Sequence, residues 1–203
     1  MINFENNQNE ITRHNYVIKK EDRMRSKGHK PCVIWITGLS CAGKSTIANA
    51  LEEKLNKLII HTFNLDGDNV RYGLNKDLGF SDEDRIENIR RIGEVLKFFI
   101  DSGLIVIASF ISPFKKDRQW LRGLFGYNEF IEVYINTPIE VCEKRDNKGL
   151  YKKARNGLIK KFTGIDSPYE PPENHEIEIK TESCCVEQAV EKILLYLQKQ
   201  QII

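Results

Sequence analysis

The chain has 203 residues and a formal net charge of +2, with 40% hydrophobic and 30% charged residues. This length predicts one domain with a sizeable core, and the composition is that of an ordinary globular protein. The small net charge argues against a nucleic-acid-binding protein, which would carry a strong basic excess. No apolar run approaches the ~20 residues that span a membrane, so we expect no membrane contact.

Residues 1–15 are polar and rich in asparagine, without the apolar segment of a signal peptide, so we expect a cytoplasmic protein. The five cysteines lack repeated Cys-x-x-Cys spacing and predict neither a disulfide framework nor a zinc site. We interpret residues 1–24 as an N-terminal arm, with a short charged helix beginning at Glu21. Residues 25–203 are then expected to form a single domain.

The first predicted strand, residues 32–37, leads into a complete phosphate-binding loop. Residues 38–46 match the pattern G-x-x-x-x-G-K-[ST], and a helix is predicted over residues 46–55. Backbone N–H groups of such a loop surround phosphate oxygens, Lys44 supplies a positive charge, and Ser45 offers a hydroxyl to Mg²⁺. The candidate ATP-binding residues are Gly38, Leu39, Ser40, Cys41, Ala42, Gly43, Lys44, Ser45 and Thr46.

Strand and helix patterns alternate along the rest of the chain, which predicts an α/β fold with a parallel sheet covered by helices on both faces. Further strands are expected at residues 58–65, 104–110, 130–135 and 177–179. Further helices are expected at residues 84–101, 115–125, 138–145 and 186–198. The helix at 84–101 has apolar residues at spacings of three and four and can be capped by Ser81. Residues 147–173 are rich in glycine and proline, which is typical of a lid.

Two carboxylates, Asp66 and Asp68, follow the second predicted strand, at the edge of the sheet where α/β proteins bind ligands. Phosphoryl transfer to an alcohol uses one carboxylate to help hold Mg²⁺ and one to accept the hydroxyl proton. Either aspartate could take either role. We assign catalytic duty to Lys44, Asp66 and Asp68, and place the metal at Ser45 and Asp68.

A cationic cluster is predicted near the start of the helix at 84–101. Arg85 and Asn88 are one turn apart, on a face expected to lie opposite the apolar stripe, and Arg71 precedes them. Together they would suit an anionic acceptor. An exposed helix face, with ion pairs such as Arg91 with Glu94, is an equally good interpretation of these residues alone.

Six sequence segments resemble adenylylsulfate kinase, a family that phosphorylates the 3′-hydroxyl of adenosine 5′-phosphosulfate with ATP. They are Leu-Asp-Gly-Asp-Asn-Val-Arg at 65–71, Gly-Leu-Asn-Lys-Asp-Leu-Gly-Phe-Ser at 73–81, Asp-Arg-Ile-Glu-Asn-Ile-Arg-Arg at 84–91, Phe-Ile-Ser-Pro at 110–113, and the segments 148–155 and 162–171. The resemblance runs from about residue 24 to 179. Two residues depart from the family pattern. Cys41 stands where the family usually has Gly, and Asn147 stands where Pro or Val is common.

The resemblance implies a P-loop kinase domain at 25–203 with a lid at about 147–173, Mg²⁺ as cofactor, ATP and adenosine 5′-phosphosulfate as substrates, and a homodimer. It also implies that Phe80 and Phe162 stack on the acceptor adenine while Arg71, Arg85 and Asn88 hold the phosphosulfate. The implied acceptor-binding residues are Asp66, Asp68, Arg71, Phe80, Arg85, Asn88, Ile111, Ser112, Lys148, Leu150 and Phe162.

Ser112 has two interpretations. The family resemblance implies a phosphoserine intermediate at this catalytic position. Direct in-line transfer with Asp68 as the base needs no covalent intermediate, and a serine nucleophile would need its own base. In the second interpretation, which we favour, the Ser112 hydroxyl forms a hydrogen bond with the acceptor.

Three alternative functions remain. A related kinase could use a different anionic nucleotide. A GTPase-type switch would need N-K-x-D and D-x-x-G, but residues 75–78 and 147–150 lack the final aspartate and Asp66 is followed by Asn69. The chain could also be the kinase part of a larger sulfate-activating enzyme, although its terminal helix without a linker favours a stand-alone protein.

Overall fold

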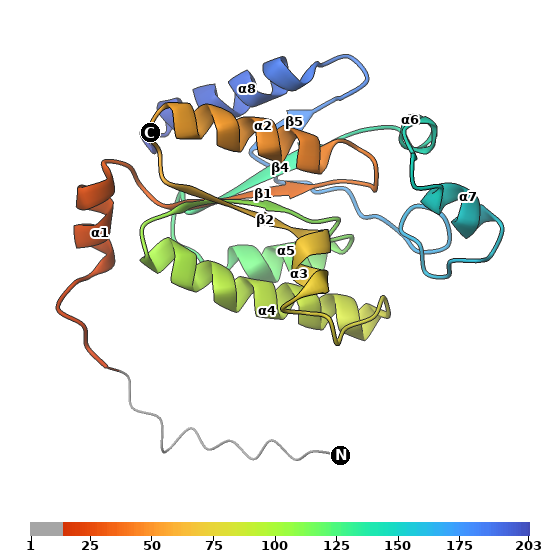
Figure 1. Cartoon of the computed structure of the whole chain (residues 1–203), viewed down its shortest axis with the longest axis horizontal. Coiled ribbons are helices and arrows are strands. Elements are labelled where there is room, and N and C mark those ends of the chain that lie inside the picture. The colour runs from red at the N-terminus through yellow and green to blue at the C-terminus, as the bar shows by residue number, and fades with distance from the viewer. Residues whose placement is uncertain (1–13) are drawn as a thin grey trace.

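The computed structural model describes residues 14–203, which form one parallel sheet between two helical layers (Figure 1). Most of the predicted N-terminal arm, residues 1–13, lies outside the described residues. Helix α1 (Lys20–Lys27) spans the predicted boundary at residue 24, and Gly28 is its C-terminal cap. No helix between residues 14 and 203 is long and apolar enough to cross a membrane.

The sheet has five strands in the order β2-β3-β1-β4-β5, and every neighbouring pair is parallel. The strands are β1 (Cys32–Thr37), β2 (Thr62–Asp66), β3 (Ile105–Ser109), β4 (Phe130–Ile135) and β5 (Ile177–Ile179). The remaining helices are α2 (Lys44–Lys57), α3 (Gly67–Tyr72), α4 (Asp82–Asp101), α5 (Lys115–Arg122), α6 (Ile139–Lys144), α7 (Leu150–Arg155) and α8 (Val186–Lys199). This arrangement confirms the predicted α/β class.

Alternate side chains of the central strand β1 enter two separate cores. Ile34 packs in one core with residues of α2 and α8, and Trp35 packs in the other with residues of α4 and α5. Every residue of β1 and of its neighbour β3 is buried. Continuous apolar strands are typical of a parallel sheet covered on both faces, and Figure 1 shows α2 and α8 on one side and α4 and α5 on the other.

All five strands point toward one edge of the sheet, because every pair is parallel. The phosphate-loop segment, α3, α6 and α7 gather at this edge (Figure 1). Loops at the carboxyl edge of a parallel sheet are where α/β proteins bind their ligands. The topology therefore brings segments that are distant in sequence to one place.

Several predicted boundaries were wrong. The second strand begins at Thr62 rather than at residue 58, because α2 continues to Lys57 and the chain reverses at Ile59, whose φ is 61°. Leu58 and Ile59 are apolar but exposed, so their pattern resembled a strand. Helix α5, predicted at residues 115–125, ends at Arg122.

Two short helices were not predicted. Helix α3 follows β2 directly and is capped by the Asp66 side chain, which accepts a hydrogen bond from the Asp68 N–H. Helix α7 lies inside the segment expected to be an irregular lid, and its Tyr151 and Ala154 are buried. Both helices have six residues, which is too short for a clear periodic signal.

The long helix α4 begins at Asp82, two residues before the predicted start, and Ser81 caps it as predicted, its side chain accepting a hydrogen bond from the Asp84 N–H. The predicted orientation of its polar residues was wrong. Arg85 and Asn88 are buried together with Ile89 on the inner face, whereas Ile86 is exposed. Arg85 can be buried because backbone and side-chain oxygens accept its hydrogen bonds.

Candidate active site

A cavity of about 550 Å³ lies at the carboxyl edge of the sheet. It is lined by the phosphate loop, α3, the start of α4, the loop after β3 and residues of the 148–163 segment. All of the predicted acceptor-binding residues line it. Of the nine loop residues expected to bind ATP, those at the cavity wall are Ser40, Cys41, Lys44 and Ser45.

The phosphate loop depends on glycine at its start. Gly38 has a φ of +151°, and a Cβ there would lie 2.7 Å from the carbonyl oxygen of Ile135. The side chain of Lys44 is buried, and its Nζ donates a hydrogen bond to the Leu39 carbonyl at 2.7 Å. Burial lowers the pKa of Lys44 to about 8. A phosphate beside this ammonium would favour its charged form.

Asp66 occupies the point where β2 meets α3, close to the phosphate loop. Its Oδ2 accepts hydrogen bonds from Ser45 Oγ at 2.7 Å and from Ser109 Oγ at 2.9 Å. Its Oδ1 accepts one from the Asp68 N–H at 2.9 Å. Burial acts to raise the pKa of Asp66, but these hydrogen bonds outweigh it and hold the pKa below its usual range. Asp66 is therefore a stable anion next to the loop hydroxyl.

Asp68 has a different environment, although it is only two residues away. Its carboxylate is largely exposed and lies 3.1 Å from Nζ of Lys148. This hydrogen bond raises the pKa of Lys148. Because an exposed ion pair contributes little stability, the pair can open readily. Asp68 is thus the more accessible of these two carboxylates.

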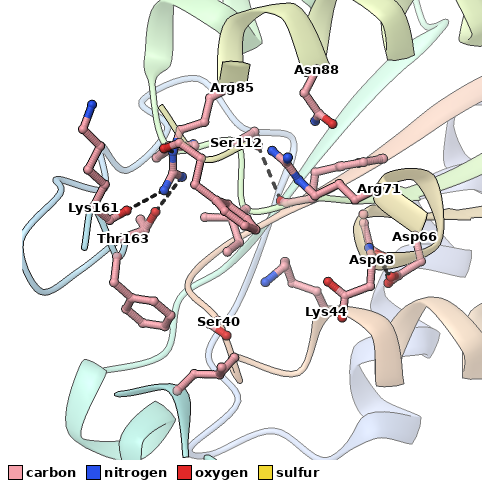
Figure 2. A pocket seen from close by; sticks show the side chains of 18 of the residues that line it. Ser40, Lys44, Asp66, Asp68, Arg71, Arg85, Asn88, Ser112, Lys161 and Thr163 are labelled. Carbon is pink, nitrogen blue, oxygen red and sulfur yellow. Dashed lines mark hydrogen bonds between the residues drawn. The ribbon is translucent and has the colours of Figure 1, made fainter. Parts of the chain in front are cut away.

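Figure 2 shows Arg85 directed toward the 148–163 segment. It donates hydrogen bonds to Thr163 Oγ1 at 2.9 Å, to the Lys161 carbonyl at 2.6 Å and to the Phe80 carbonyl at 3.2 Å. Asn88, one turn further along α4, accepts a hydrogen bond from Asn75 at 3.0 Å. The exposed ion-pair alternative is therefore wrong for Arg85 and Asn88.

Aromatic rings enter the cavity wall from two segments. Phe80, before α4, is 62% exposed, and the guanidinium of Arg71 lies 4.6 Å from its ring centroid. Arg71 also donates a hydrogen bond to the Gly79 carbonyl at 2.7 Å. Phe162 comes from the predicted lid and packs edge-on against Tyr151 at 4.9 Å. An exposed ring beside a guanidinium is suited to stacking with a nucleotide base.

Ser112 lies in a network of buried hydroxyl groups. Its Oγ accepts a hydrogen bond from the Trp35 indole at 3.1 Å and donates one to Thr37 Oγ1 at 3.0 Å. The Thr37 hydroxyl donates to the Ile111 carbonyl at 2.7 Å and lies 3.0 Å from the Tyr169 hydroxyl. Within residues 14–203, no histidine or carboxylate is hydrogen-bonded to the Ser112 hydroxyl. This environment supports a positioning role better than a nucleophilic one.

Several cavity residues were missed in the sequence: Ile89, Ser109, Asp117, Lys160, Lys161 and Thr163. Ser109 is the next-to-last residue of the predicted strand at 104–110, and Thr163 lies inside a segment of family resemblance, so both had a detectable signal. Asp117 had none, because a single acidic residue in the first turn of a helix is commonplace.

The donor set near the phosphate loop is compatible with Mg²⁺. No group of three or more His, Cys, Asp or Glu residues between 14 and 203 could hold a metal ion. Mg²⁺ is commonly bound through one or two carboxylates together with substrate phosphates, rather than in an all-protein cage. The Ser45 hydroxyl and the carboxylates of Asp66 and Asp68 fit this pattern.

Comparisons with known proteins agree with this geometry. The profile of the family described as adenylylsulphate kinase matches residues 30–180. The adenylyl-sulfate kinase of Marinobacter nauticus is 56% identical over 95% of this chain and 97% of its own length. The structure of Mycobacterium tuberculosis APS kinase CysC in complex with AMPPNP and APS has a TM-score of 0.80 and 41% identity, over 84% of this chain and 99% of that one. The hexameric APS kinase from Thiobacillus denitrificans has a TM-score of 0.66 and 30% identity, over 89% of this chain and 30% of that one.

Proposed function

This chain belongs to the adenylylsulfate kinase family, and we propose on that basis that it transfers the γ-phosphoryl group of ATP to the 3′-hydroxyl of adenosine 5′-phosphosulfate. The products are ADP and 3′-phosphoadenylylsulfate. The observation that carries the proposal is that one cavity is lined both by a phosphate loop with two nearby carboxylates and by aromatic rings and guanidinium groups. ATP is a substrate, and the reaction belongs to sulfate activation.

The donor phosphates lie against the phosphate loop, where Lys44 faces the outer phosphates. Ser45 and Asp66 would hold Mg²⁺, since their side chains already lie 2.7 Å apart beside the loop. A bound Mg²⁺ would supply positive charge that offsets the negative charge of the outer phosphates. This assignment moves the main carboxylate ligand from Asp68 to Asp66, within the two options that the sequence left open.

Asp68 acts as the base. Its carboxylate takes the proton of the 3′-hydroxyl while that oxygen forms a bond to the γ-phosphorus, and the bond from phosphorus to the β–γ bridging oxygen breaks. The electron pair leaves with ADP. Lys44 stabilises the charge that develops on the transferred group. Lys148, which pairs with Asp68 at 3.1 Å, must release this carboxylate when the acceptor binds.

The acceptor occupies the rest of the cavity. Phe80 and Phe162 stack on its adenine, and the clamp residues Arg71, Arg85 and Asn88 hold its phosphosulfate. Arg85 spans two segments, which supports a role in closing the 147–173 lid over the bound nucleotide. The remaining proposed contacts are Ile111, Ser112, Lys148 and Leu150.

The assembly is proposed to be a homodimer in the cytoplasm. Large apolar side chains are exposed on several helices, among them Phe98 at 77% and Leu195 at 56%, and a partner subunit would cover such surface. The five cysteines are free thiols, which is consistent with a reducing compartment. Sedimentation measurements would determine the number of subunits.

One assay tests the function. The protein is incubated with ATP, Mg²⁺ and adenosine 5′-phosphosulfate, and we expect stoichiometric ADP and a 3′-phosphorylated product. AMP and GMP serve as competing acceptors. If either is phosphorylated more efficiently than adenosine 5′-phosphosulfate, the acceptor assignment is wrong. If no acceptor is phosphorylated, the kinase assignment itself is wrong.

A further inference from the structure

Asp117, near the start of α5, is a carboxylate of the cavity wall to which the proposed mechanism gives no role. Three carboxylates line the cavity, and two have partners: Asp66 accepts hydrogen bonds from two serines, and Asp68 pairs with Lys148. The Oδ2 atom of Asp117 is buried and has no hydrogen-bond partner among residues 14–203. A buried oxygen without a partner is unfavourable, so its presence at a cavity wall calls for a function.

Asp117 lines the same cavity as Arg85 and Asn88 of the proposed phosphosulfate clamp, and α5 packs on the helix α4 that carries them. Both helices start at the carboxyl edge of the sheet, and a Cβ on Gly93 would lie 3.0 Å from a methyl group of Leu121. Asp117 on α5 and Ile89 on α4 each come four residues, about one helical turn, before these contact residues, and both line the cavity. Asn88 of the clamp is the neighbour of Ile89.

The cavity is otherwise rich in positive charge. Its cationic lining residues are Lys44, Arg71, Arg85, Lys148, Lys160 and Lys161. Such a cavity favours the more highly charged of two anions. A terminal phosphate carries between one and two negative charges near neutral pH, with a second pKa of about 6, whereas a terminal sulfate carries one. Positive charge alone would therefore favour ADP over adenosine 5′-phosphosulfate in the acceptor position.

We propose that Asp117 is a specificity-determining residue of the acceptor pocket, where its carboxylate repels a doubly charged terminal phosphate. It thereby selects a nucleoside 5′-phosphosulfate over a nucleoside 5′-diphosphate. The inference rests on the proposed function, because it requires the phosphosulfate to lie at the clamp. Selection against ADP matters because the reaction itself produces ADP, which would otherwise occupy the acceptor position.

The protonation state of Asp117 sets the conditions of the test. Burial raises its pKa, while the charges of Arg118 and Lys116 act in the opposite direction and that of Glu170 adds to the rise. Measurements at about pH 8, well above the ordinary range for aspartate, keep the carboxylate ionised.

The experiment measures acceptor-site affinity while an excess of AMPPNP occupies the phosphate loop. Wild-type protein and Asp117→Asn are titrated with adenosine 5′-phosphosulfate and with ADP. We expect the variant to bind ADP about tenfold more tightly, the scale of the interaction between two unit charges in a partly screened site. Affinity for the phosphosulfate should change much less. Asp117→Glu keeps the charge and should keep the wild-type ratio of the affinity for adenosine 5′-phosphosulfate to the affinity for ADP. Glu52→Gln, which removes a surface charge at α2, should also leave this ratio unchanged.

The outcomes separate this inference from the proposed function. Asp117 does not determine specificity if Asp117→Asn binds both ligands more tightly by the same factor, or if neither affinity changes. The same conclusion follows if the wild type already binds ADP as tightly as adenosine 5′-phosphosulfate. Turnover of adenosine 5′-phosphosulfate by the wild type is measured in parallel, and its absence overturns the proposed function instead. Should Asp117→Asn fail to bind AMPPNP, the comparison is repeated with Asp117→Ser.

Discussion

Nη2 of Arg85 donates a hydrogen bond to the main-chain carbonyl of Lys161 at 2.6 Å. This bond joins the first turn of α4 to the 147–173 segment, and Thr163 adds a second bond at 2.9 Å. An arginine proposed to hold the acceptor therefore also holds the segment proposed to cover it. Loops that close over substrates commonly complete the site in this way.

Replacing Arg85 with lysine should weaken use of the acceptor. A lysine ammonium cannot reproduce the planar fork that reaches both Thr163 and the Lys161 carbonyl. We expect kcat/KM for adenosine 5′-phosphosulfate to fall by an amount that corresponds to ~1–3 kcal/mol of activation free energy, the scale of a hydrogen bond to a charged group. Steady-state kinetics should show little change in the KM for ATP. Arg90→Lys, on the exposed face of the same helix, is the matched control, and an equal loss there would assign the effect to helix stability.

Asp68→Asn should lower kcat with little change in the KM for the acceptor, because a base acts mainly in the transition state. Loss of a general base commonly costs about 10²–10⁴ in rate. Asp66→Asn should instead raise the Mg²⁺ concentration needed for half-maximal rate, because Asp66 lies next to Ser45. Titration of each variant with Mg²⁺ distinguishes the roles. The reverse pattern would exchange the two assignments.

Ser112→Ala should leave an active enzyme with a higher KM for the acceptor. The substitution removes the oxygen that accepts the Trp35 N–H, and a buried donor left without a partner costs about 1–3 kcal/mol of stability. Thermal unfolding should detect this loss. Incubation of wild-type protein with labelled ATP alone should give no protein-bound phosphate. Stoichiometric label on Ser112 that is transferred to added acceptor would establish the phosphoserine route.

ATP affinity should fall as the pH rises above about 8, the pKa to which burial lowers Lys44. Phosphate stabilises the charged ammonium, so ATP binding at higher pH must be accompanied by proton uptake. Calorimetry in buffers of different ionisation enthalpy measures that uptake directly. In Lys44→Met the uptake should vanish, and Cys41→Ser tests whether the loop thiol contributes. Proton uptake that persists in Lys44→Met would assign it to another group.

Much of the fold could be predicted from short stretches of sequence. The buried strands β1, β3 and β4 and the long helix α4 have periodic or continuous apolar patterns, because each element buries a whole face. The phosphate loop could be predicted as well, since its function depends on backbone conformations and groups within nine consecutive residues. The family segments located the predicted acceptor-binding residues of the cavity, whereas Ser109, Asp117, Lys160 and Lys161 lie outside those segments and were missed.

The sequence by itself thus determined the α/β class, the phosphate loop and the family, because these depend on local patterns. Only the tertiary structure decided which aspartate lies beside Ser45, that Arg85 points inward to Lys161, and that the Ser112 hydroxyl binds Trp35. Each of these relationships joins residues more than twenty positions apart. They depend on how parallel strands and two helical layers pack, and local sequence patterns carry no information about that packing.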